Sequence, residues 1–119
     1  MQPQKRHWSR RLALQALYQW QISDHEIDEI LAQYVEDENW EKTDKDYFVD
    51  LVSQSISQHE NLASTFSPYL NLPLEQIDPI ENAILLFSTY ELLNKPKTPT
   101  NVIHKFVNGV LDKVAQQRT

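Results

Sequence analysis

The segment from His104 to Lys113, HKFVNGVLDK, combines an aromatic ring, two lysines and the only glycine of the chain. The surrounding pattern predicts a helix, where glycine costs roughly 0.5–1 kcal/mol relative to alanine. On a wheel of about 100° per residue, Phe106 lies at the edge of the buried stripe, with Gly109, Lys113 and Lys105 on its outward side. An aromatic face with flanking cations is typical of single-stranded RNA recognition, because bases stack on the ring and phosphates pair with lysine. These four residues are candidate RNA contacts.

A structural explanation of the same glycine remains open. Gly109 can simply permit a close crossing with another helix, in which case Phe106 is an ordinary core residue. The wheel by itself favours this structural interpretation.

A second group of cations opens the chain. Lys5, Arg6, Arg10 and Arg11 precede the first acidic residue, Asp24, although the whole chain has a net charge of −6. A basic pole on an otherwise acidic protein indicates binding of a polyanion. The alternative is a solvated tail, and charge alone leaves both possibilities open.

The sequence predicts no enzyme, metal site or cofactor. It has no cysteine, its four histidines are scattered without metal-ligand spacing, and one glycine cannot build a phosphate-binding loop. The acidic residues near Asp28 fit the solvated face of an amphipathic helix. No signal peptide or membrane-spanning run is visible, and we expect a cytoplasmic protein.

A helical period along the chain predicts a single all-α domain. Its first helix is strongly apolar and ends at Ile22, which places it centrally in a bundle. Asp78-Pro79-Ile80-Glu81 has the composition of a helix start, with Asp78 as N-cap, and the apolar helix after it must be buried on several sides. The expected helices are about 5–22, 24–38, 44 to near Pro68, 79–93 and one ending near Gln116, with a short turn or helix at 74–77.

The ordered motifs of the chain resemble those of the NusB family of bacterial transcription antitermination proteins. The resemblance extends from about Arg6 to Ala115, and its last motif is highly specific. The motifs are RxxALQALYQWQ (10–21), DKDYFVDLV (44–52), PYL (68–70), PIENAILL (79–86), YEL (90–92) and HKFVNGVLDK (104–113).

The resemblance implies a compact bundle of about five or six helices in two small subdomains, here 1–70 and 71–119. It also implies binding of single-stranded boxA RNA together with ribosomal protein NusE, and action on RNA polymerase with other Nus factors. The implied RNA contacts are the N-terminal cations and the aromatic motif: Lys5, Arg6, Arg10, Lys105 and Phe106. The implied NusE-facing residues are Tyr18, Tyr69, Glu75 and Glu81.

The chain departs from the family pattern between Pro99 and His104. Family members carry about fifteen further residues there, an amphipathic helix and the loop after it. Loss of that helix should uncover several hundred Å² of apolar surface, at about 25 cal/mol per Å². We therefore expect self-association, low stability or repacking of the remaining helices.

Two other functions compete with RNA-binding antitermination. One is a helical adaptor that binds only proteins, and the other is an RNA-targeting accessory domain like those fused to some ribosomal RNA methyltransferases. The basic residues 5–11 favour RNA over the adaptor, and the lack of a catalytic domain after Thr119 argues against the accessory domain.

Overall fold

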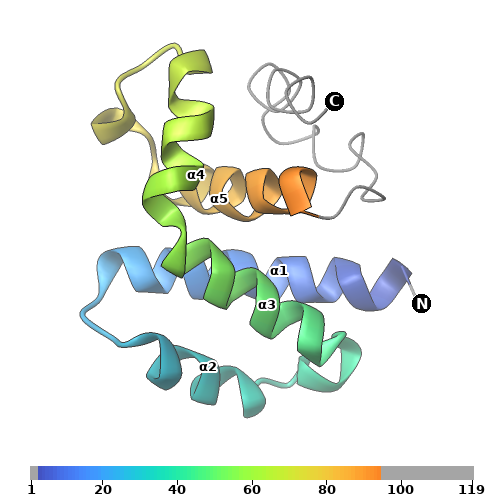
Figure 1. Ribbon diagram of the computed structural model, residues 1–119. Coiled ribbons are helices and arrows are strands. Elements are labelled where there is room, and N and C mark those ends of the chain that lie inside the picture. Colours follow the sequence, from blue (N-terminus) through green and yellow to red (C-terminus); the bar gives the residue numbers. More distant parts are fainter. Residues whose placement is uncertain (1–2, 95–119) are drawn as a thin grey trace. The chain divides into compact units, whose positions relative to one another are not determined.

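The computed structural model describes residues 3–94, in which every regular element is a helix and there is no strand (Figure 1). This confirms the all-α prediction. The described residues belong to two compact units, unit 1 up to Ser57 and unit 2 from Gln58 onward. The elements are α1 (Pro3–Ile22), α2 (Ile27–Val35), η1 (Trp40–Lys42), α3 (Lys45–Ser57), α4 (His59–Phe66), η2 (Ser67–Tyr69), η3 (Leu74–Gln76) and α5 (Pro79–Asn94), where η marks a 3-10 helix.

In unit 1, α1 packs against both α3 and α2 (Figure 1). The apolar positions of α1 and α3 recur at three- and four-residue steps, so each helix turns one stripe toward the other. Burial of that stripe is the main stabilising contribution to the unit. The fully buried apolar side chains of unit 1 are Leu12, Ala13, Ala16, Leu17, Ile30, Phe48, Leu51 and Val52.

The second helix is shorter than the sequence predicts. It starts after Glu26, whose backbone N–H donates to the Glu29 carboxylate at 3.2 Å, and it ends at Val35. Val35, the last residue of the helix, is 52 % exposed. The segment that follows contains the 3-10 turn η1.

The predicted third helix is two helices, α3 and α4. Gln58 separates them with φ −107° and ψ 15°, outside α-helical geometry. The hydrophobic period does not reveal this break, since the buried Ser55 and Leu62 are seven residues apart and keep the same phase. The helix ends at Phe66, and Pro68 lies in η2.

In unit 2, α5 begins as predicted. The Asp78 carboxylate accepts the N–H of Ile80 at 2.7 Å, and Pro79 is the first helical residue. Ten consecutive residues, Ala83 to Leu92, are buried, so the helix is covered on several sides as expected. Within the unit α5 packs against α4. The subdomain boundary after Leu70 stays a prediction.

The predicted last helix lies outside the described residues. The same is true of the expected excision between Pro99 and His104. The candidate residues affected are Lys105, Phe106, Gly109 and Lys113.

Candidate nucleic-acid interface

The N-terminal cations lie on α1, which begins at Pro3. Lys5 is exposed, and Arg6 and Arg10 are half-buried. The basic pole is therefore part of a folded helix rather than a solvated tail. Because Arg6 and Arg10 are four residues apart, they lie on the same side of the helix.

Both arginines lie over one aromatic ring, that of Tyr47 in α3. The guanidinium carbon of Arg6 is 4.3 Å from the ring centre, and that of Arg10 is 5.9 Å from it. Tyr47 is only 6 % exposed, so the ring is a fixed support. Each such contact contributes about 0.5–2 kcal/mol. The two positive charges are held in place before any ligand arrives.

Ser9 ties α1 to the start of α3. Its hydroxyl is completely buried, lies 2.9 Å from the carbonyl oxygen of Lys5 and 2.8 Å from that of Asp44, and accepts the N–H of Asp44 at 3.0 Å. Asp44 in turn caps α3 by accepting the N–H of Tyr47 at 3.2 Å. This chain of hydrogen bonds fixes Tyr47 relative to the arginines above it.

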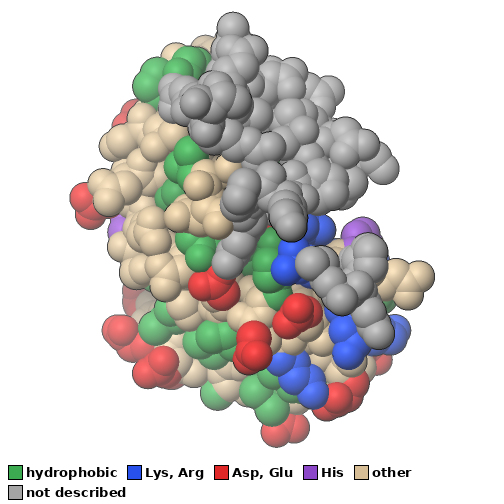
Figure 2. Space-filling model, turned by 45° about the vertical axis from the view of Figure 1, so that its right-hand side comes forward, with side chains coloured by type: hydrophobic (Ala, Val, Ile, Leu, Met, Phe, Trp, Pro, Cys, Tyr) green, Lys and Arg blue, Asp and Glu red, His purple; other side chains and the backbone are tan. Residues whose placement is uncertain are grey.

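Trp8 supports a second pair of cations. The Arg11 guanidinium carbon and the Lys42 ammonium nitrogen each lie 4.6 Å from its ring centre. Sequence reasoning did not select Trp8 or Lys42, although the three-residue spacing of Trp8 and Arg11 is a readable signal. Figure 2 shows Lys and Arg side chains on the same face of the molecule as Asp and Glu side chains.

The four residues expected to face a protein partner are divided between the units. Tyr18 lies on α1 in unit 1 and is 37 % exposed. Tyr69, Glu75 and Glu81 lie in unit 2, where Tyr69 is half-buried and both glutamates are exposed. Their assignment to a partner stays a prediction.

Residues 3–94 contain no group of three or more acidic or histidine side chains that could hold a metal ion. No helix within that range is long and apolar enough to cross a membrane. Burial, with a smaller contribution from the Asp37 carboxylate, raises the pKa of Tyr34 from 10.0 to about 12.

The fold and this surface define an all-helical protein that presents cations stacked on aromatic rings at the start of its first helix. The sequence of residues 7–104 matches the model of the NusB family, and the chain belongs to that family. It is 37 % identical to the transcription antitermination protein NusB of Pseudoalteromonas atlantica, over 95 % of this chain and 92 % of that protein. The NusB protein of Pseudomonas savastanoi pv. phaseolicola is 38 % identical, over 93 % of this chain and 77 % of that protein. The NusB protein of Idiomarina loihiensis is 36 % identical, over 95 % of this chain and 93 % of that protein.

The alignment with the Pseudoalteromonas protein also bears on the predicted excision. It extends over 129 positions but covers only 95 % of the 119 residues of this chain, about 113 residues, so about 16 residues of the relative have no counterpart here. A deletion in this chain is consistent with that difference. Its location between Pro99 and His104 stays a prediction.

Proposed function

We propose that this protein is a transcription antitermination factor that binds single-stranded boxA RNA together with ribosomal protein NusE. Membership of the NusB family and the names of the relatives support the antitermination role. The observation that carries the RNA-binding part is the stacking of Arg6 and Arg10 on the buried Tyr47 ring. The complex acts on elongating RNA polymerase with other Nus factors, in the cytoplasm and without catalysis or a cofactor.

The proposed RNA surface has two parts. The first consists of Lys5, Arg6 and Arg10, whose positive charges attract the phosphates. The second consists of Lys105, Phe106, Gly109 and Lys113, where a base stacks on the ring and lysines pair with the flanking phosphates. NusE binds the protein through a surface that includes Tyr18, Tyr69, Glu75 and Glu81.

A helical adaptor that binds only proteins is the second candidate function. Exposed apolar side chains in unit 2 favour a protein contact there; among the described residues they are Leu72, Leu74, Ile80 and Leu93. That contact alone gives no role to the stacked arginines of α1, so RNA binding is the better explanation of the whole molecule.

Titration of boxA RNA with the purified chain, with and without NusE, tests the proposal. We expect tighter binding with NusE present, and an affinity that falls with salt by about 0.7 unit of log K per phosphate contact for each unit of log salt concentration. A control RNA of equal length and scrambled sequence should bind more weakly. Binding of NusE without any RNA binding would support the adaptor instead.

A further inference from the structure

The Trp8 ring and its two cations form a cluster that the proposed RNA contacts do not use. We call Trp8, Arg11 and Lys42 the Trp8 cluster. Trp8 is half-buried, while Arg11 and Lys42 are exposed. Trp8 follows Arg6 by two residues, and Arg11 follows Arg10 by one. Because each residue turns the helix by about 100°, the Trp8 cluster lies on a different side of α1 from the two arginines over Tyr47.

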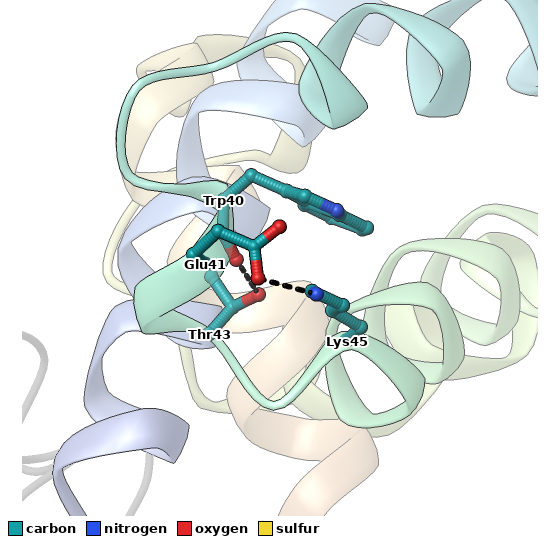
Figure 3. Close-up of polar contacts among 4 residues, drawn as sticks. All are labelled: Trp40, Glu41, Thr43 and Lys45. Atoms are coloured by element: carbon teal, nitrogen blue, oxygen red, sulfur yellow. Dashed lines mark hydrogen bonds and ion pairs between the residues drawn. The ribbon is translucent and has the colours of Figure 1, made fainter.

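The turn that carries Lys42 is anchored at both ends. At its start, the Trp40 ring meets the buried Phe48 ring edge-on, with centroids 5.5 Å apart and planes at 87°. At its end, the buried Thr43 donates its hydroxyl to the carbonyl oxygen of Trp40 at 2.7 Å (Figure 3). The next residue, Asp44, is bonded to Ser9. The backbone at Lys42 is thus held beside the helix that carries Trp8.

The charges of the cluster are not neutralised by their nearest acidic neighbour in the sequence. The Glu41 carboxylate is 2.7 Å from the ammonium nitrogen of Lys45 (Figure 3). Within residues 3–94, neither Arg11 nor Lys42 forms an ion pair with a carboxylate.

The two cations of the cluster also repel each other. Both lie 4.6 Å from one ring centre, so they are within twice that distance of each other. This upper limit on their separation is close to the screening length of about 8 Å at physiological salt, so salt does not screen the repulsion completely. A bound anion would relieve it.

We propose that the Trp8 cluster binds a nucleotide of single-stranded RNA. The base stacks on the exposed Arg11 guanidinium, which the Trp8 ring supports from the other side, and Lys42 and Arg11 pair with the adjacent phosphate. An acidic peptide would satisfy the charges but has no base to stack on the guanidinium plane, which is why RNA fits this surface better. The inference rests on the proposed RNA-binding function and adds a nucleotide subsite to it.

Variants of the full chain test the subsite, with boxA-type RNA extended by uridines at either end as the probe and NusE present. Trp8→Ala should weaken binding roughly fivefold to 150-fold, as expected for loss of one stacked base, and Trp8→Phe should retain most of the affinity. Arg11→Gln and Lys42→Gln should each reduce the slope of log K against log salt concentration by about 0.7. Arg11 and Lys42 are exposed, so their substitution should not disturb the fold. Their variants therefore still test the subsite if Trp8→Ala destabilises the protein and lowers its thermal midpoint.

The matched control is the double variant Glu41→Gln/Lys45→Gln, which removes the neighbouring ion pair without changing the net charge. It should leave the affinity unchanged. If the unmodified chain binds RNA and all four cluster variants bind equally well, the subsite is wrong and the proposed function stands. If the unmodified chain does not bind RNA, both are wrong. If the variants lose affinity for NusE in the absence of RNA, the cluster is a protein contact and the RNA subsite is wrong.

Discussion

Individual side chains in unit 1 combine charge with aromatic support. Arg6 is the clearest case, because its guanidinium carbon lies 4.3 Å from the centre of a buried ring while its neighbour Lys5 is exposed. The Nε–H of Arg6 is buried and has no hydrogen-bond partner among the described residues, so stacking is what holds this side chain. A charge fixed in this way loses less conformational entropy when a phosphate binds than a mobile side chain does.

Phe106 is the residue on which the second part of the proposed RNA surface depends. Phe106→Ala should weaken boxA binding by about 1–3 kcal/mol if the ring stacks on a base. The measurement is an RNA titration at fixed salt, with circular dichroism as a check of the fold. Val107→Ala, which truncates a residue predicted to be buried on the same helix, is the control for a purely structural effect. Unchanged affinity in a folded Phe106→Ala variant would contradict stacking.

Tyr34 predicts a specific alkaline response. Its pKa is about 12 in the folded chain and returns to 10.0 on unfolding. The folded chain therefore holds the phenolic proton more tightly, and the stabilisation from Tyr34 is present in full below pH 10 and is lost as pH rises toward about 12. Denaturant unfolding across this range should show a steeper fall in stability for the unmodified chain than for Tyr34→Phe. The control is Tyr18→Phe, the same change at an exposed ring. If stability falls equally steeply with pH in the unmodified chain and in Tyr34→Phe, the raised pKa of Tyr34 is contradicted.

At the scale of elements, the contact between α1 and the start of α3 positions both groups of cations. The hydrophobic stripe brings the two helices together, but it does not determine where η1 lies along α1. Ser9 makes that choice, because its buried hydroxyl bonds both the N–H and the carbonyl of Asp44. The position of Lys42 over Trp8 follows from this connection.

Ser9→Ala should destabilise unit 1. The change removes the hydrogen bonds of the buried Ser9 hydroxyl to Asp44 and leaves the Asp44 N–H with only its longer bond of 3.3 Å to the carbonyl oxygen of Lys5, which costs about 1 kcal/mol. Thermal unfolding should show a fall of roughly 4–8 °C for each kcal/mol lost. The control is Ser64→Ala. Ser64 is an exposed residue of α4, and its replacement by alanine increases the helix propensity by the same amount as Ser9→Ala. Equal midpoints for the two variants would mean that the bond contributes nothing.

The whole molecule is an acidic chain in which the cations of unit 1 are gathered on α1, on η1 and at the first residue of α3. Its net charge of −6 by itself argues against binding RNA. Local charge decides this question, because exposed charges further apart than about 10 Å are largely screened from each other at ordinary salt. Binding of RNA should therefore depend on the few stacked cations far more than on the total charge.

The predicted deletion between Pro99 and His104 has its consequence at this scale. A chain that lacks a covering helix exposes apolar surface, and the purified protein should self-associate as its concentration rises or unfold unusually easily. Sedimentation velocity over a wide concentration range, paired with thermal unfolding, measures both. A stable and monodisperse monomer would mean that the remaining helices have repacked.

The local features of the fold were predictable from the sequence. The end of α1 at Ile22, the cap of α5 at Asp78 and the burial of α5 were expected, since each depends on residues close together in the chain. The break at Gln58 was not predicted, because a break that keeps the phase of the apolar residues leaves the period unchanged.

Among the candidate residues, the basic pole of Lys5, Arg6 and Arg10 was predictable, because a group of cations near the start of a chain is visible without any fold. The aromatic rings that support these cations were not predictable, because they depend on how the helices pack. Arg6 meets Tyr47, and Trp8 meets Lys42, across contacts between residues far apart in the chain. Such pairs depend on how α1, η1 and α3 pack, and no local pattern encodes that packing.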